Sequence, residues 1–371
     1  MERDELSGWL RLTLSPGVGN DSARRLLAAF GLPGAIFEQP THALQQLLGP
    51  AQCAALQREP EGLPDLLERT CAWLQEAPRE RAVVSLADAR YPAALLNIED
   101  PPPLLYLMGR LDLPLEAGRC LAMVGSRNPT PQGNLNARQF AQALAEAGLT
   151  IVSGMALGID GAAHEGALAA AAPQRLATIA VVGTGLDRVY PKTHRELAHR
   201  IAAHGLIVSE YPLGTPPLAA NFPRRNRLIA GLSGATLVVE AALQSGSLIT
   251  ARMAGEQGKE VYAIPGSIHA TQSRGCHALI RQGAKLVESA QDVLEDLPGF
   301  SAHTAPPASD IPREGEDTLL QALGLDPASL DALQARTGLD VAALQARLMT
   351  LELDGQVARL PGGLWQRLVR A

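Results

Sequence analysis

The residues with the clearest chemical potential lie in one short stretch, 221–233. Phe222 supplies an aromatic face, and three guanidinium groups follow it closely, from Arg224, Arg225 and Arg227. The intervening proline suits a first helical position and apolar residues then recur at helical spacing, so this stretch predicts the start of a helix. Arginines there oppose the helix dipole unless an anion meets them. Clustered arginine beside an aromatic face is typical of single-stranded nucleic-acid binding, although a solvated basic surface with Phe222 as a core anchor would also fit.

A repeated pattern that begins near residue 119 supplies the elements that would position these side chains. Each repeat has a short apolar run, a turn rich in Gly and Ser, and a segment with helical periodicity. Strands buried on both faces that alternate with helices are typical of an α/β fold with a doubly wound parallel sheet. The apolar runs are 120–124, 149–152, 176–182, 206–208, 235–239 and 261–264.

The turns after these runs carry the polar residues. In an open parallel sheet such turns lie along one edge, at the carboxyl ends of the strands, so we expect them to form one site. Basic residues come from three different turns, which suits several successive phosphates better than one pyrophosphate. The candidate residues are Gly125, Ser126, Arg127, Lys192, Phe222, Arg224, Arg225, Asn226, Arg227, Ser245, Gly246 and Ser247.

Several other kinds of site are disfavoured. No turn combines a complete GxGxxG with an acidic residue about 20 positions later, so we expect no dinucleotide cofactor, and a Walker lysine turn is also absent. The four cysteines lie far apart without a CxxC pair, which argues against a zinc site or disulfides. Asp160 and His164 share a helix face and could hold a metal or a base. Without a third ligand nearby, we favour a capping Asp160 and a hydrogen-bonded His164, and no metal.

Length and charge limit the architecture and the partners. A chain of 371 residues is too long for one ordinary core, so we expect two or three domains. The net charge of −6 is unfavourable for nucleic-acid binding, but Lys and Arg exceed Asp and Glu within 119–290, between two acidic flanks. A polyanion responds mainly to the charges near its binding site, because salt screens the more distant ones. The start does not resemble a signal peptide and no apolar run reaches about 18 residues, so we expect a cytoplasmic protein without membrane contact.

A series of ordered motifs spans residues 124–284. They are Val124-Gly125-Ser126-Arg127, Ser153-Gly154-Met155-Ala156, Ile159-Asp160, Tyr190-Pro191, Ser209-Glu210-Tyr211-Pro212, Phe222-Pro223, Arg225-Asn226-Arg227, Gly246-Ser247, Pro265-Gly266, Gly275-Cys276-His277, Leu279-Ile280 and Gly283-Ala284. Together they resemble the DNA processing protein A family (DprA, also called Smf). The resemblance implies a homodimeric single-stranded DNA binding protein that protects incoming DNA in natural transformation and loads the RecA recombinase onto it. It also implies an extended Rossmann-like domain, preceded by a small helical domain and often followed by a winged helix.

This outline divides the chain into four parts. We expect a SAM-like or helix-hairpin-helix domain at 1–85, the extended Rossmann-like DNA-binding domain at 86–296, a linker at 297–315 and a winged helix at 316–371. Residues 87–112 are predicted to be an extended, turn-rich approach because prolines interrupt them.

The two flanking domains carry weaker signals for DNA contact. A Gly-x-Gly turn at 17–19 could present N–H groups to a phosphate, but helix hairpins also need such turns for geometry alone. The recognition-helix candidate at 340–353 has a single basic residue, Arg347, which favours protein contact or very weak DNA binding.

The main alternative is an enzyme. Glu240 follows a predicted strand and lies before Gly246-Ser247, where it could be the acid of a nucleotide-cleaving hydrolase of the phosphoribohydrolase type. An ionised carboxylate would equally well bind loop N–H groups. The chain lacks the Gly-Gly-x-Gly-Thr turn of the phosphoribohydrolases, and the analogy rests on fold alone, so we expect a protein without catalytic turnover.

Overall fold

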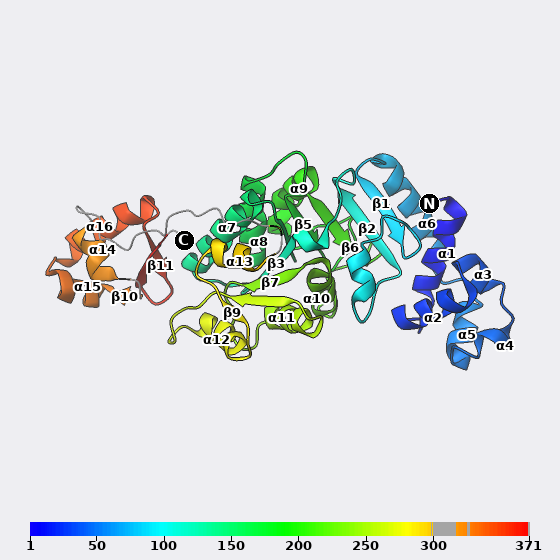
Figure 1. Cartoon of the computed structure of the whole chain (residues 1–371). Coiled ribbons are helices and arrows are strands. Elements are labelled where there is room, and N and C mark those ends of the chain that lie inside the picture. Colours follow the sequence, from blue (N-terminus) through cyan, green and yellow to red (C-terminus); the bar gives the residue numbers. More distant parts are fainter. Residues whose placement is uncertain (298, 300–316, 325–326, 370–371) are drawn as a thin grey trace.

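The computed structural model describes residues 1–297, 299, 317–324 and 327–369. Within these ranges the chain forms a helical domain, a domain built on a nine-stranded sheet, and a small domain of helices with a three-stranded sheet. The helical domain and the small C-terminal domain lie at opposite ends of the sheet domain (Figure 1). The predicted linker at 297–315 falls almost entirely outside the described residues and stays a prediction. Among the helices that are described, none has the length and apolar character needed to cross a membrane.

The helical domain begins with two helices, one before and one after the Gly-x-Gly turn at 17–19. They are α1 (Arg3–Leu14) and α2 (Asn20–Phe30). The domain continues with α3 (Pro33–Phe37), α4 (Thr41–Leu44), α5 (Pro50–Leu56) and α6 (Leu63–Glu76). Proline stands in the first or second helical position of α3, α5 and α6, where the missing N–H costs no intrahelical hydrogen bond.

The helical domain and the sheet domain share one hydrophobic core. Leu6 and Trp9 of α1 and Trp73 of α6 belong to the same buried cluster as Val83 and Tyr106 of the sheet. Trp73 packs edge-on against Tyr106, with ring centroids 6.2 Å apart and planes inclined by 62°. Edge-to-face packing of this kind is favourable beyond the area that it buries. The two domains are therefore packed together as one body rather than joined only by a linker.

The large sheet has the strand order β1-β2-β6-β5-β4-β3-β7-β8-β9, and its strands are parallel from β6 to β9. Six of its strands confirm the predicted apolar runs. They are β3 (Cys120–Val124), β4 (Thr150–Ser153), β5 (Thr178–Val181), β6 (Leu206–Ser209), β7 (Ala235–Val238) and β8 (Glu260–Ala263).

Three further strands correct the sequence-based boundaries. β1 (Arg81–Ser85) pairs antiparallel with β2 (Leu104–Gly109), and β2 pairs antiparallel with β6. Residues 81–85 thus belong to the sheet rather than to the helical domain, so the boundary predicted at residue 85 is wrong. The extended, turn-rich approach predicted over 87–112 did not include β2. The prolines before β2 interrupt the sequence pattern by which a strand buried on both faces would be predicted. The short edge strand β9 (Lys285–Leu286) was also missed.

Helices cover both faces of this sheet. On one face, α10 (Asn221–Leu232), α11 (Ser247–Glu256) and α12 (Arg274–Arg281) contribute to one buried cluster. On the other, α7 (Pro131–Glu146), α8 (Ile159–Ala169) and α13 (Ala290–Asp296) form a second cluster, and α9 (Arg195–His204) packs onto the core shared with the helical domain. The doubly wound fold is confirmed.

The C-terminal domain contains the three helices and hairpin expected of a winged helix. Its helices are α14 (Thr318–Leu323), α15 (Leu330–Thr337) and α16 (Val341–Leu353), and its strands are β10 (Ala328–Ser329), β11 (Val357–Leu360) and β12 (Leu364–Arg367). Arg347 of α16 pairs with Asp317 at 2.7 Å, while Met349 and Leu353 are exposed. The solvent side of α16 therefore carries apolar residues and a neutralised arginine, and its protein or DNA partner remains a prediction.

Candidate nucleic-acid interface

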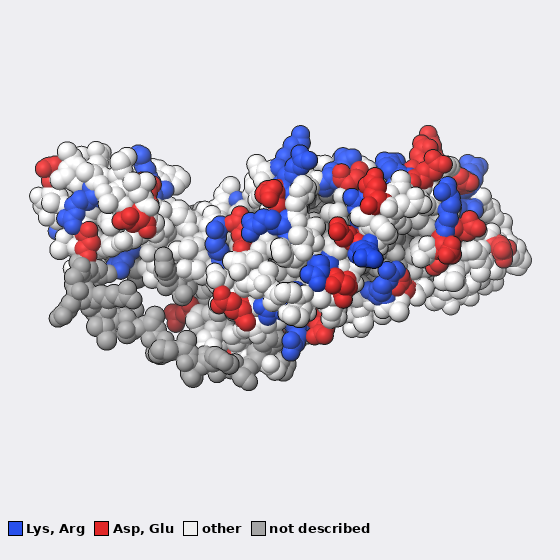
Figure 2. All heavy atoms as spheres, turned by 90° about the horizontal axis from the view of Figure 1, so that it is seen from above, with Lys and Arg blue, Asp and Glu red and all other residues white. Residues whose placement is uncertain are grey.

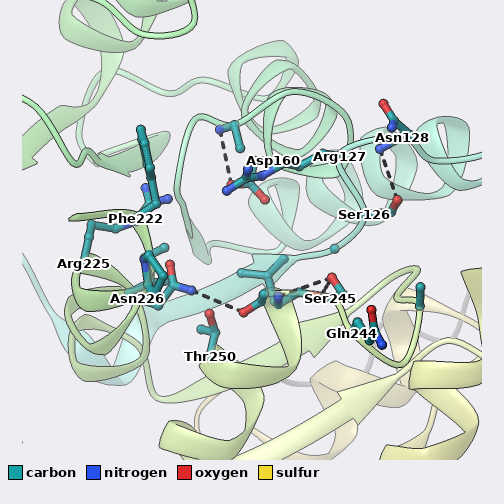
Figure 3. A pocket seen from close by; sticks show the side chains of 18 residues that line it. Ser126, Arg127, Asn128, Asp160, Phe222, Arg225, Asn226, Gln244, Ser245 and Thr250 are labelled. Carbon is teal, nitrogen blue, oxygen red and sulfur yellow. Dashed lines mark hydrogen bonds between the residues drawn. The ribbon is translucent and has the colours of Figure 1, made fainter. Parts of the chain in front are cut away.

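A pocket opens at the carboxyl end of β3. From β3 the sheet continues to β4 on one side and to β7 on the other, and open α/β sheets bind ligands where the strand order reverses in this way. The pocket has a volume of about 430 Å³ and is lined by the end of β3 and the starts of α8, α10 and α11 (Figure 3). Helix N-termini carry partial positive charge, which favours an anionic ligand.

Most of the predicted site residues meet at this pocket. Those that line it are Gly125, Ser126, Arg127, Phe222, Arg225, Asn226, Ser245, Gly246 and Ser247. Lys192, Arg224 and Arg227 lie outside its lining. Asn128, Gln244 and Thr250 also line it, and sequence reasoning missed them. Their positions beside the recognised Gly-Ser-Arg and Gly-Ser motifs were the available signal, because neighbours of a strand-end turn share its edge of the sheet.

A cation and two aromatic rings lie together at the rim. The guanidinium carbon of Arg127 is 5.9 Å from the ring centroid of Phe222, and the ring of Tyr190 is 5.4 Å from Phe222, tilted by 36°. Arg127 is exposed, Tyr190 is 47% exposed and Phe222 is half-buried, so solvent reaches all three. Tyr190 was not predicted as a site residue, although it stands in the Tyr-Pro motif just before Lys192. These side chains offer stacking surfaces next to a phosphate-binding charge.

Arg225 lines the floor of the pocket and is not exposed at its rim. Its side chain is buried, and it donates hydrogen bonds to the carbonyl oxygens of Val181 and, at 2.6 Å, of Gly154. Burial lowers the pKa of Arg225 to about 10, against the opposing effect of the nearby Asp160 carboxylate. The guanidinium therefore stays charged at neutral pH. It ties the loop after β4 to α10 while placing positive charge at the pocket floor.

Arg227 is paired inside the protein. Its guanidinium donates to both carboxylate oxygens of Glu210 at 2.6 Å each, and the two side chains are only 9% and 6% exposed. Burial disfavours the charged form, but the hydrogen bonds that Arg227 donates to Glu210 outweigh this effect and raise the pKa of Arg227. The sequence predicts that arginines at this helix start need an anion from outside the protein. The fold instead supplies internal acceptors to Arg225 and Arg227 and leaves Arg224 half-exposed.

The two candidate metal or base residues serve the structure. The Asp160 carboxylate accepts from the backbone N–H groups of Gly154 at 3.2 Å and Ala156 at 3.3 Å, so it holds the loop before α8 rather than capping its own helix. His164 is buried, and its Nδ1 lies 2.7 Å from the Thr178 hydroxyl. Burial lowers the pKa of His164 to about 3, so the ring is neutral. The described part of the chain holds no cluster of three or more potential metal ligands.

Glu240 is engaged with the loop that leads into α7. Its carboxylate accepts from the backbone N–H of Thr130 at 2.9 Å and from the Thr130 hydroxyl at 2.6 Å. Thr130 in turn caps α7 by accepting from Gly133, where an added Cβ would lie only 2.4 Å from the Glu240 carboxyl carbon. Burial raises the pKa of Glu240, against the hydrogen bonds from Thr130. Of the two roles that the sequence left open, loop binding is the one that the structure displays.

Comparison with known proteins settles the family. Residues 82–298 match the family model described as DNA recombination-mediator protein A, and residues 303–363 match the DprA winged helix domain. Protein Smf of Escherichia coli is 42% identical over 82% of this chain and 82% of its own length. The chain belongs to the DNA processing protein A (DprA/Smf) family. The resemblance carried by the motifs, the Rossmann-like fold and the winged helix are confirmed.

Solved structures of this family agree with that assignment. DprA from Streptococcus pneumoniae has a TM-score of 0.65 and 37% sequence identity, covering 80% of this chain and 98% of that one. DprA from Helicobacter pylori, described for its unique single-stranded DNA binding mode, has a TM-score of 0.51 and 33% identity over 57% of this chain and 93% of that one.

In this DprA-family chain, the charges that matter to a bound ligand are those close to its binding site. On the face shown in Figure 2, basic and acidic side chains are interspersed rather than gathered by sign. Around the start of α10 and the Gly-Ser-Arg turn, Arg127 and Lys192 are exposed, and Arg224 is half-exposed with Asp100 at 3.6 Å. Because salt screens exposed charges beyond about 8–10 Å, these nearby cations matter more to a bound phosphate than the net charge of −6 does.

Proposed function

We propose that this protein binds single-stranded DNA at the rim of the pocket without catalytic turnover. The observation that carries this proposal is the group formed by Arg127, Phe222 and Tyr190, which combines a cation with two accessible aromatic faces. Unpaired bases stack on such rings with little regard for sequence, whereas duplex DNA keeps its bases inside. The described binding mode of the Helicobacter pylori relative supports the same ligand.

We infer a biological role from this ligand and from the relatives. The protein protects incoming DNA during natural transformation and loads the RecA recombinase onto it in the cytoplasm. The proteins named DNA processing protein DprA in Bacillus subtilis and Streptococcus pneumoniae, 40% and 49% identical to this chain, support a role in DNA processing. Loading requires simultaneous contact with the strand and the recombinase, and no bond-breaking chemistry.

Salt dependence tests the phosphate contacts. If Arg127, Lys192 and Arg224 each neutralise one phosphate, the plot of log K against log salt has a slope near −2, since each contact contributes about −0.7 on a single strand. Arg127→Ala in the full chain should reduce the magnitude of that slope by about 0.7. Arg58→Ala, a change of the same charge on the exposed surface of the helical domain, should not. Affinity indifferent to salt, or a preference for duplex, would contradict the proposal.

Strand length tests the homodimer. We expect the full chain to form a homodimer with two linked DNA sites, so that binding of the second site becomes intramolecular. Apparent affinity should rise sharply once an oligonucleotide is long enough to bridge both protomers. Light scattering and a length series of oligothymidylates measure the two properties together. A monomeric protein whose affinity does not depend on oligonucleotide length would rule out bridging and leave the single-site DNA proposal intact.

A nucleotide-release assay tests the hydrolase alternative. Because the Glu240 carboxylate is engaged by Thr130 and lies outside the lining of the pocket, we expect no release of base or phosphate from nucleotides. Release that is abolished by Glu240→Gln and retained in Glu256→Gln, a change on exposed α11, would favour a phosphoribohydrolase instead.

A further inference from the structure

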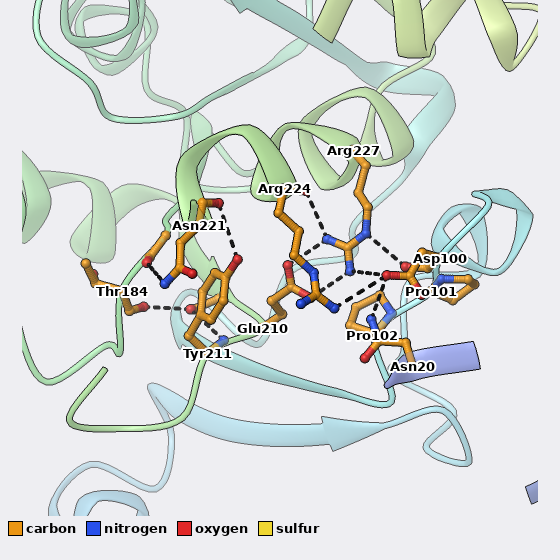
Figure 4. Close-up of polar contacts among 12 residues, drawn as sticks. Asn20, Asp100, Pro101, Pro102, Thr184, Glu210, Tyr211, Asn221, Arg224 and Arg227 are labelled. Carbon is orange, nitrogen blue, oxygen red and sulfur yellow. Dashed lines mark hydrogen bonds and ion pairs between the residues drawn. The ribbon is translucent and has the colours of Figure 1, made fainter. Parts of the chain in front are cut away.

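Asp100 lies where the helical domain, the loop before β2 and helix α10 meet (Figure 4). On the side of the helical domain, its carboxylate accepts from the Asn20 amide at 3.0 Å and pairs with Arg24 at 3.1 Å. Arg24 also donates to the carbonyl oxygen of Pro101 at 3.2 Å. These contacts fasten α2 to the loop that carries Asp100.

The same carboxylate faces two arginines of α10. It lies 3.5 Å from the Arg227 guanidinium and 3.6 Å from that of Arg224. Arg227 is already held by both oxygens of Glu210 and by the Asp100 carbonyl oxygen at 2.9 Å, and it is almost fully buried. Arg224 is 50% exposed and has the longer, looser contact. Of the two, Arg224 is the side chain that can turn outward to a ligand.

We propose that Asp100 is a positioning residue that restrains Arg224 and thereby sets how strongly the start of α10 attracts a DNA phosphate. This inference rests on the proposed DNA-binding function and deepens it. The carboxylate competes with the phosphate for one guanidinium, because both are anions and Arg224 cannot pair fully with each. Arg24 acts in the opposite direction, since it draws the charge of Asp100 towards the helical domain.

This arrangement links the helical domain to DNA affinity. A phosphate that takes Arg224 leaves Asp100 to Arg24 and Asn20, so DNA binding strengthens the contact of α2 with the Asp100 loop. By reciprocity, weakening the Arg24 contact must weaken DNA binding. The helical domain thus influences the site without any contact of its own with the strand.

The isosteric variant Asp100→Asn tests the competition directly. It keeps the shape of the side chain, and its backbone carbonyl still accepts from Arg227, while the negative charge is removed. Asn20 and Arg24 donate to different oxygens of the Asp100 carboxylate, so the one amide oxygen of the variant can accept from only one of them. We expect the full chain to bind an oligothymidylate about two- to fivefold more tightly at low salt, the range of a partly exposed ion pair. The salt slope should steepen by up to about 0.7, as one further phosphate contact forms.

Two matched variants isolate the cause. Asp112→Asn makes the same change in net charge at an exposed carboxylate paired with Arg110, so it should leave affinity and slope unchanged. In an Arg224→Gln background the gain from Asp100→Asn should disappear. A gain that persists without Arg224 would overturn the proposal, as would Asp100→Asn binding that equals or falls below that of the unmodified chain.

A second variant, which is expected to weaken DNA binding, keeps the test decisive if Asp100→Asn does not fold. Arg24→Gln leaves the charge of Asp100 to Arg224 and should weaken binding about twofold with a shallower slope. Arg25→Gln, at an exposed neighbouring position on α2, should leave binding unchanged. Equal effects of the Arg24 and Arg25 variants would overturn the proposal. If the unmodified chain fails to bind single strands, the DNA-binding function itself falls. If the changes at Asp100 and Arg24 both leave DNA affinity unaltered, only the proposed role of Asp100 is rejected.

Discussion

Phe222→Ala is expected to weaken binding of a single-stranded oligonucleotide by about 1–3 kcal/mol, roughly 5- to 150-fold in Kd. The physical reason is the loss of a stacking surface, since Phe222 presents its half-buried ring close to Arg127 and Tyr190. Stacking releases no counterions, so the salt slope should stay nearly unchanged. Fluorescence anisotropy across a salt series measures both quantities.

The conservative variant Phe222→Tyr provides the control, because it keeps a ring of the same size and should retain most of the affinity. Circular dichroism establishes that each variant is folded. If Phe222→Ala unfolds the protein while the folded fraction binds as tightly as before, then Phe222 is a core anchor and the stacking proposal is wrong.

Glu210→Ala is expected to lower the free energy of unfolding by about 3–5 kcal/mol. The change leaves the guanidinium of Arg227 buried without the carboxylate that takes two of its hydrogen bonds, and an uncompensated buried charge is strongly destabilising. Chemical denaturation of the full chain measures the effect, provided that the transition remains cooperative. Glu196→Ala, an exposed glutamate on α9, should change stability by less than about 0.5 kcal/mol.

The double variant Glu210→Ala with Arg227→Met distinguishes an unpaired charge from lost packing. Removing the charge as well should restore much of the stability, because an apolar side chain of similar length needs no partner. A loss below about 1 kcal/mol in Glu210→Ala alone would mean that Asp100 and solvent satisfy Arg227 without Glu210.

The sequence predicted the central strands because a parallel sheet buries both faces of each strand. A short, continuous apolar run such as 120–124 then has few alternative explanations. β1 and β2 were not predicted because they form an antiparallel addition at the edge of the sheet. β1 directly follows the helical domain, and prolines precede β2, so neither belongs to the repeating strand-turn-helix pattern that identified the rest.

The site was predicted in its location and less well in its chemistry. Strand-end turns must share one edge of the sheet, so the residues around Gly125, Phe222 and Gly246 could be grouped correctly. The roles of Arg225 and Arg227 could not be read in the same way. Their acceptors come from residues distant in sequence, such as Gly154 and Glu210, and become neighbours only when the sheet forms.

The packing of Trp73 against Tyr106 means that this protein is not modular in the way its domain names suggest. A fragment that lacks residues 1–76 would uncover Tyr106 of β2 and Val83 of β1, which now share a core with α1 and α6. The helical and sheet domains should accordingly melt as a single cooperative unit. The winged helix has a buried cluster of its own, so its exchange would leave the rest of the core unchanged. Substitutions at the buried positions of α1 and α6, such as Trp9 and Trp73, have to be compatible with the sheet against which they pack.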